Sequence, residues 1–135
     1  MRGVLVDTGP LVATIDADDA FHERCVTAWR RLYEPLLTVW PVMTEAMHLV
    51  GSPLAQERLW DLLDKRGLEL LPLGATDVPR MRALMKKYHD LPMDVADAAL
   101  VRVAEREGLS TIFTIDQDEF RTYRLNGTRR FRVLP

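Results

Sequence analysis

The sequence contains almost no cysteine and no long apolar run, and each absence excludes a class of protein. Cys25 is the only cysteine among 135 residues, so the chain has neither an internal disulfide framework nor a cysteine metal cluster. The longest apolar runs fall far short of the roughly 20 residues that a membrane-spanning helix requires. The amino-terminal segment reaches an acid at Asp7, which interrupts the apolar core that a signal peptide needs. We therefore expect a cytoplasmic protein with no membrane partner.

The chain also lacks repeats, low-complexity segments and an excess of charge of one sign. No linker-like stretch divides it, and its length suits one compact core, so residues 1–135 are predicted to form a single domain. The formal net charge of −2 argues against non-specific coating of nucleic acid. Five arginines and no acid nevertheless follow Phe120: Arg121, Arg124, Arg129, Arg130 and Arg132. Two interpretations stay open, a solvated basic tail and a phosphate-contacting surface with Arg129 and Arg130 as candidate substrate contacts.

Apolar spacing predicts strands that alternate with helices. Short apolar runs typical of buried strands lie at residues 4–6, 36–40, 68–73, 111–115 and 131–134. Helical spacing predicts helices that begin near residues 8–10 and that cover 21–33, 41–50, 54–65, 78–88 and 94–107. Gly67 and Gly108 are expected helix stops, Thr76 or Asp77 an expected cap, and a polar loop is expected after Ile115. This alternation predicts an α/β fold with a parallel sheet covered on both faces.

Two acids directly follow predicted strands. Asp7 comes after residues 4–6, and Asp116 comes after the run at 111–115. Either acid alone could begin a turn or cap the next helix, because Asp binds local backbone amides. Sites in parallel sheets lie beyond the carboxyl ends of the strands. Two such acids in one small sheet therefore favour a shared pocket.

Asp97 lies within the apolar face of the helix predicted at 94–107. On a helical wheel of about 100° per residue, it falls between Ala104 and Val101, in an arc without Lys or Arg. A carboxylate turned toward an apolar interior is costly unless it is hydrogen-bonded, paired or metal-bound, so we interpret Asp97 as a metal-binding or catalytic residue. Asp94 is better explained as the helix N-cap, although its i, i+3 spacing from Asp97 also allows a metal contact.

Glu45 carries the weakest signal, because it only borders the apolar stripe of the helix predicted at 41–50. Glu45 becomes a candidate site residue only as one of four carboxylates, together with Asp7, Asp97 and Asp116. No His or Cys cluster accompanies these acids. Hard divalent cations such as Mg²⁺ and Mn²⁺ prefer oxygen ligands, and they activate water and stabilise charge at a phosphate. Without a cation, clustered acids repel one another and their pKa values rise. The acids thus predict a Mg²⁺ or Mn²⁺ cofactor.

The same residues carry a resemblance to PIN-domain ribonucleases. Four segments resemble that family's motifs in order: Val-Leu-Val-Asp7-Thr8-Gly-Pro-Leu-Val-Ala, Thr44-Glu45, Met93-Asp94-Val-Ala-Asp97-Ala-Ala-Leu and Phe113-Thr114-Ile-Asp116-Gln-Asp118-Glu-Phe120. Their spacing and the total length are similar to those of VapC-type toxins across essentially the whole chain. The resemblance implies a three-layer α/β/α fold around a mostly parallel sheet of about five strands.

The resemblance also assigns roles to particular residues. The acids that match the family's catalytic quartet are Asp7, Glu45, Asp97 and Asp116. The implied metal ligands are Asp7, Asp97 and Asp116, with Asp94 as an extra acid. Thr114 matches a hydroxyl position beside the site and Thr8 is a further polar neighbour, so both are candidate substrate contacts. In the fourth motif, Asp118 and Glu119 are alternative acids.

The function implied by the resemblance is that of a metal-dependent endoribonuclease, the toxin component of a type II toxin–antitoxin pair. Its implied partners are RNA, a VapB-like antitoxin and a second copy of the chain. The homodimer is also favoured by large apolar residues in the first half: Leu36, Trp40, Met47 and Trp60.

Three alternative functions fit the sequence less well. A receiver-like phosphotransfer module needs an acidic pair after the first strand and a late lysine, but no lysine follows Lys87. A haloacid-type phosphatase needs Asp-x-Asp, whereas this chain has Asp7-Thr8-Gly9. A catalytically inactive PIN-fold protein that binds RNA or assembles with partners is the closest alternative. Such proteins often lose acids, and this chain keeps all four.

Overall fold

The computed structural model describes the whole chain, residues 1–135. Its centre is a five-stranded sheet in the order β3-β2-β1-β4-β7, in which every neighbouring pair is parallel. The strands are β1 (Val4–Val6), β2 (Leu36–Thr38), β3 (Glu69–Leu70), β4 (Thr111–Phe113) and β7 (Arg132–Leu134). The parallel sheet of about five strands expected from the sequence is confirmed.

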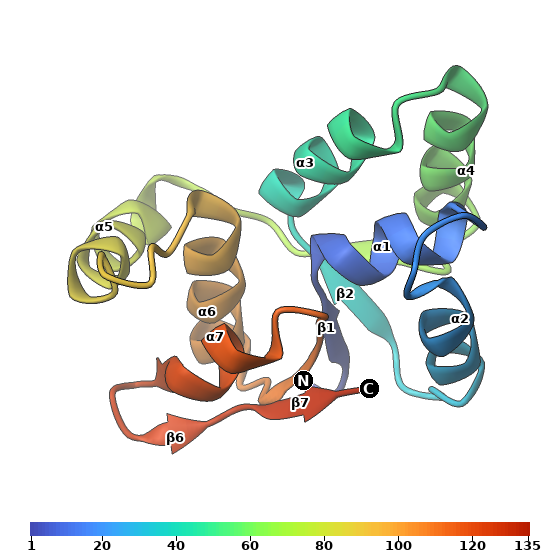
Figure 1. Cartoon of the computed structure of the whole chain (residues 1–135). Helices are drawn as coiled ribbons and strands as arrows, with labels where there is room; N and C mark the ends of the chain where they lie inside the picture. Colours follow the sequence, from blue (N-terminus) through green and yellow to red (C-terminus); the bar gives the residue numbers. More distant parts are fainter.

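Helices flank the sheet in two groups. They are α1 (Thr8–Ile15), α2 (His22–Arg30), α3 (Trp40–Val50), α4 (Pro53–Asp64), α5 (Val78–Lys87), α6 (Val95–Glu107) and α7 (Gln117–Thr122). Figure 1 shows α1 to α4 on one side and α5 to α7 on the other. No helix combines the length and apolar character needed to cross a membrane.

The strand order reverses beside β1. The chain passes from β1 through β2 to β3 at one edge, and then places β4 on the opposite side of β1. At such a reversal the connections from adjacent strands lead away in opposite directions and leave a crevice beyond the carboxyl ends of the strands. Asp7 follows β1 and Thr114 follows β4, so both residues lie at this crevice.

The central strands are buried on both faces. Leu5 and Val6 of β1 and Ile112 and Phe113 of β4 are fully buried. A parallel strand covered by helices on both faces requires a continuous apolar run, which is the pattern found at residues 4–6. The buried apolar side chains form one contiguous cluster of 32 residues. A single domain over residues 1–135 stays a prediction.

Several expected element boundaries are wrong, including that of the third strand, which covers only Glu69–Leu70 of the expected residues 68–73. The second strand ends at Thr38, and α3 begins at Trp40 rather than at Pro41. Pro41 fits the first helical turn, where its missing N–H and constrained φ are tolerated. The helix α4 ends at Asp64, and Gly67 is not the residue that stops it. The left-handed conformation expected at a helix stop is found at Arg66, with φ of 57°.

Asp77 precedes α5 but does not cap it with its side chain. Its carboxylate accepts hydrogen bonds from the Gly74 backbone N–H at 2.9 Å and from Arg102 and Arg106 of α6 at 2.8 and 3.0 Å. The Gly74 hydrogen bond, followed by those from the two arginines, lowers the pKa of Asp77 to about 2. Pairing with cations of the neighbouring helix has displaced the capping role expected from the sequence.

The loop expected after Ile115 contains a helix and a hairpin. The helix α7 is followed by β5 (Arg124–Leu125) and β6 (Arg129–Arg130), which pair antiparallel. Phe120 of α7 and Tyr123, the C-cap residue that ends α7, are fully buried, so tertiary packing stabilises a helix that is too short to form alone. Asn126 and Gly127 both have positive φ, as a tight hairpin turn requires.

Candidate active site

Asp7 lies at the carboxyl end of β1 and is only 4% exposed. One of its carboxylate oxygens accepts a hydrogen bond from the Thr8 backbone N–H at 2.8 Å, and the other accepts one from the Thr114 hydroxyl group at 2.8 Å. Thr114 is itself buried, and its Oγ1 accepts a hydrogen bond from the Asp116 N–H at 3.0 Å. The residues after β1 and β4 are thereby joined, as the shared pocket predicted from the sequence requires.

Thr8 contributes an unpaired polar atom to the same place. Its residue is buried beside Asp7, and its Oγ1 has no hydrogen-bond partner in the protein. Buried polar atoms in proteins are nearly always paired, and an orphan suggests a missing water or ion. The Thr8 hydroxyl group is therefore available to a ligand of the site.

Asp97 lies in the first turn of α6 and is half-buried. Its Oδ2 accepts a hydrogen bond from the Tyr123 hydroxyl group at 2.8 Å. Asp94 is the exposed N-cap of α6, and its carboxylate accepts a hydrogen bond from the Asp97 N–H at 2.8 Å. The capping role predicted for Asp94 is confirmed, and its metal contact remains a prediction.

Two of the carboxyl groups, Asp7 and Asp97, have raised pKa values. Burial is the main cause that raises the pKa of Asp7 to about 6, and the negative charges of Asp116 and Glu45 add to it against the opposing hydrogen bonds. Burial also raises the pKa of Asp97 to about 8, with Asp7 as the next cause and with Asp94 and Asp116 contributing. Asp7 is therefore close enough to Glu45, Asp97 and Asp116 for electrostatic interaction with each of them.

Glu45 is half-buried on α3 and faces a surface hollow of about 580 Å³ between α3 and the start of α6. The residues that line it are Trp40, Pro41, Thr44, Glu45, His48, Asp94, Val95 and Ala96. Asp116 is exposed at the start of α7, where its side chain makes no capping hydrogen bond. Asp118 is fully exposed beside Arg121, at 3.8 Å.

The residues fit a hard divalent cation that keeps part of its water shell. No three His, Cys, Asp or Glu side chains are arranged to hold a metal ion by themselves. Mg²⁺ usually binds one or two carboxylates and retains several waters. The oxygen-only donors, the raised pKa values of Asp7 and Asp97 and the unpaired Thr8 hydroxyl group all suit such an ion.

The structure does not bring Arg129 and Arg130 into contact with the acids. Both side chains are exposed on β6, and neither forms a hydrogen bond or ion pair with an acidic residue. In Figure 1, β6 lies well apart from the junction of β1 and α1 that carries Asp7. If these arginines bind RNA, they contact a part of the strand away from the acids.

Tyr123 is a site residue that the sequence pattern did not identify. The residue lies 26 positions from Asp97, in a segment that was expected to be a polar loop. The only signal that could have identified it is the i, i+3 spacing of Phe120 and Tyr123, which places two aromatic side chains on one helical face.

The raised pKa values predict how the stability of the metal-free protein depends on pH. A carboxyl group whose folded pKa is raised stabilises the fold below its unfolded pKa of about 4, and this stability is lost as the pH rises through the folded value. The stability from Asp7 is therefore lost between about pH 4 and about pH 6, and the stability from Asp97 between about pH 4 and about pH 8. We expect Asp97→Asn to raise the melting temperature in EDTA at pH 8.5 by roughly 4 °C, or about 1 kcal/mol.

The measurement is thermal unfolding across this pH range, with Asp64→Asn on the exposed side of α4 as the control. The advantage of Asp97→Asn over the wild type should grow with pH, whereas the control should follow the wild type. Parallel curves for all three proteins would contradict the prediction.

Comparison with known proteins identifies the family. A family model of the PIN domain matches residues 4–125. Ribonuclease VapC26 of Mycobacterium tuberculosis is 30% identical over 135 residues, which cover 98% of this chain and 100% of that protein.

Two solved structures share the fold at low sequence identity. The crystal structure of Mycobacterium tuberculosis VapC20, a sarcin–ricin loop cleaving toxin, has a TM-score of 0.78 at 17% identity, over 85% of this chain and 91% of that one. A chain of VapBC2 from Rickettsia felis, bound to a DNA fragment from its promoter, has a TM-score of 0.64 at 15% identity, over 98% and 99% of the two chains. These structures support the α/β/α fold, and the match over residues 4–125 together with the likeness to VapC26 shows that the chain belongs to the PIN-domain family.

Proposed function

We propose that this protein is a metal-dependent endoribonuclease that hydrolyses RNA phosphodiester bonds, as the toxin component of a type II toxin–antitoxin pair. The observation that carries this proposal is the buried Asp7 at the reversal of strand order, with both carboxylate oxygens hydrogen-bonded. The charges of Asp116 and Glu45 help to raise the pKa of Asp7, and the charge of Asp7 helps to raise the pKa of Asp97. The relatives agree with it, because one is named a ribonuclease and another a loop-cleaving toxin.

Asp7, Asp97 and Asp116 would hold Mg²⁺ or Mn²⁺ together with waters that the ion retains, and Asp94 is an additional acid at the same end of α6. When bound, the ion supplies a Lewis acid for the phosphate and favours the ionised form of a nearby water. The chain keeps the acids close together, and it orients Asp7 through the Thr8 N–H and the Thr114 hydroxyl group. Burial of Asp7 limits its contact with bulk water, which strengthens its interaction with a cation.

Glu45 is the fourth catalytic acid, and the hollow that it lines gives an RNA strand access from the side of α3. The two threonines differ in what they can contact. The Thr114 hydroxyl group is committed to Asp7 and Asp116, which favours a positioning role over direct contact with RNA. The Thr8 hydroxyl group has no protein partner and is available to substrate.

Single-turnover cleavage of RNA by the purified protein with Mg²⁺ or Mn²⁺ tests the proposed function. Cleavage within the chain of a labelled RNA supports an endoribonuclease. RNA binding without any turnover, at all metal concentrations, would instead support the catalytically inactive PIN-fold protein.

RNA affinity is expected to depend on the basic carboxyl-terminal segment. An acidic site on a protein of net charge −2 repels RNA, so a basic surface must supply the attraction. Replacing both Arg129 and Arg130 with Gln should weaken binding across RNA sequences and reduce the salt dependence by about one unit of slope per lost phosphate contact. Filter binding at several salt concentrations measures this change.

The matched control is the same double replacement at Arg30 and Arg31, which are exposed at the end of α2. This control removes the same charge from another surface and should leave the salt slope near that of the wild type. Unchanged RNA affinity in the Arg129 and Arg130 variant would instead support the interpretation that these residues belong to a solvated basic tail.

A VapB-like antitoxin is the proposed protein partner. The exposed tryptophans Trp40 and Trp60 provide an apolar surface for such a partner, since they are 50% and 47% exposed and their rings meet edge-to-face at 6.3 Å. Exposed aromatic clusters of this kind are typical of protein interfaces. The two residues were expected from the sequence to serve a homodimer.

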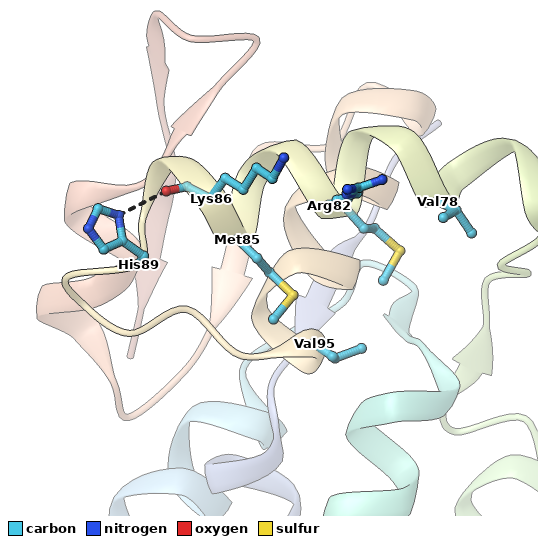
Figure 2. A pocket seen from close by; sticks show the side chains of 7 residues that line it. Val78, Arg82, Met85, Lys86, His89 and Val95 are labelled. Atoms are coloured by element: carbon cyan, nitrogen blue, oxygen red, sulfur yellow. Dashed lines mark hydrogen bonds between the residues drawn. The ribbon is translucent and has the colours of Figure 1, made fainter.

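A second copy of the chain is the other proposed partner. Of the apolar residues that motivated this prediction, Leu36 is buried in the core and Met47 is half-buried against it. Figure 2 shows another surface, a groove of about 530 Å³ between α5 and the start of α6, in which the Met85 side chain points toward Val95. Its lining is Val78, Met81, Met85 and Val95 together with the basic residues Arg82, Lys86 and His89. Val78 and Val95 are both exposed, so this groove is the face that we assign to the dimer.

Val78→Glu should convert the dimer to a monomer, because it places a charge in an apolar contact. Light scattering at micromolar concentration should give twice the 15.5 kDa chain mass for the wild type and one chain mass for the variant. Leu54→Glu, at an exposed position on α4, is the control and should remain dimeric. A monomeric wild type would contradict the dimer, and a dimeric Val78→Glu variant would contradict the assigned face.

A further inference from the structure

We propose that Tyr123 is a positioning residue for Asp97, whose carboxylate it holds by one oxygen while the other stays free for the divalent cation. The inference rests on the proposed function, because it concerns the same acidic site. It adds a residue from the carboxyl-terminal segment that none of the four family-like motifs contains.

The contact is direct and isolated. The Tyr123 hydroxyl group donates a hydrogen bond to Oδ2 of Asp97 at 2.8 Å. It is the only hydrogen bond that the Asp97 carboxylate makes within the protein. The hydrogen bond between Asp97 and Asp94 involves the Asp97 backbone N–H and not its carboxylate. Without Tyr123, the side chain of Asp97 would have no partner to set its rotamer or the plane of its carboxylate.

The ring of Tyr123 is held firmly enough to act as a support. It is fully buried and meets the rings of Tyr88 and Phe120 edge-to-face, at centroid distances of 5.0 and 5.1 Å. Phe120 packs in turn on Phe131 at 5.6 Å. Such aromatic contacts fix ring orientation, so the phenol oxygen is placed by the packing of α7 and the segment before β7.

A simpler interpretation is that Asp97 only satisfies the hydroxyl group of a buried tyrosine. The two interpretations differ in what the hydrogen bond does for a cation. A partner that orients a metal-binding carboxylate typically changes metal affinity or activity by about 10- to 100-fold. A hydroxyl group that needs only an acceptor affects stability and leaves metal affinity unchanged.

Tyr88 supplies a matched control. It lies in the same aromatic cluster, and its hydroxyl group accepts a hydrogen bond from the Arg124 N–H at 3.0 Å rather than contacting an acid. Tyr123→Phe and Tyr88→Phe therefore each remove one buried hydroxyl group from one cluster, but only the first removes a bond to Asp97.

Mn²⁺ binding to the RNA-free protein, followed by electron paramagnetic resonance, is the primary measurement. We expect Tyr123→Phe to weaken Mn²⁺ binding about 10-fold, and Tyr88→Phe to stay within about 2-fold of the wild type. In cleavage assays the metal midpoint of Tyr123→Phe should rise by a similar factor, and high Mn²⁺ should restore most of the rate, because the ligand is still present. In an Asp97→Asn background, Tyr123→Phe should cause no further loss of affinity.

Equal weakening in the two tyrosine variants, or unchanged affinity in Tyr123→Phe, overturns the positioning role. A wild type that neither binds Mn²⁺ nor cleaves RNA would instead contradict the proposed function. If Tyr123→Phe does not fold, the wild type decides the question. Its three tyrosines, labelled with ¹³C at Cζ and titrated with Mg²⁺, should show a shift at Tyr123 and none at the exposed Tyr33, and an unmoved Tyr123 resonance overturns the proposal.

Discussion

Asp7→Asn is expected to lower the rate of RNA cleavage at least about 1000-fold while the protein stays folded. An amide preserves the shape of the side chain and can still accept from the Thr8 N–H or the Thr114 hydroxyl group, which now bind the carboxylate. It removes the negative charge that attracts the cation, and cation-based stabilisation of a transition state amounts to several kcal/mol. About 4 kcal/mol corresponds to a thousandfold in rate. Single-turnover cleavage at saturating RNA measures the loss.

The melting temperature of Asp7→Asn tests whether the variant is folded, and variants at Asp116 and Asp118 test which acids belong to the site. The raised pKa of Asp7 means that its charge opposes folding in the metal-free state, so Asp7→Asn should melt no lower than the wild type in EDTA. Asp118→Asn, at the exposed acid two positions after Asp116, should remain active, whereas Asp116→Asn should not. Full activity in a folded Asp7→Asn variant would end the assignment of Asp7 to the site.

Removing divalent cations is expected to stop cleavage altogether. In EDTA, Asp7 and Asp97 have pKa values of about 6 and 8, and the remaining acids repel a phosphate. Adding Mg²⁺ or Mn²⁺ in excess of the chelator should restore the rate. Ca²⁺ should bind with little turnover, because it takes looser and higher coordination than displacement at a phosphate needs.

The decisive experiment is single-turnover cleavage across a metal titration, on RNA that is already bound. This design separates a loss of chemistry from a loss of RNA affinity. The Arg129 and Arg130 variant is a useful comparison, because it should lose affinity and keep its rate at saturating RNA. Undiminished cleavage in EDTA would contradict the metal-dependent function.

The sequence by itself determined the layered fold and the principal acids. Residues 4–6 form a strand buried on both faces, and such a strand must be continuously apolar, so its pattern was readable. Asp97 was recognisable because it interrupts an apolar helical arc, and the structure places it half-buried. In both cases the signal lies within one element, where the spacing of neighbouring residues reports the burial of that element.

Only the tertiary structure decided how the acids are held and what surrounds them. Thr114 binds Asp7 across 107 positions of sequence, and Tyr123 binds Asp97 across 26. The Asp77 carboxylate, expected to cap α5, instead accepts hydrogen bonds from two arginines of α6. The helix α7 forms because Phe120 and Tyr123 are buried by other elements. A hydrogen bond between distant residues depends on strand register and on the packing of helices against the sheet, and local spacing in a sequence carries no record of either.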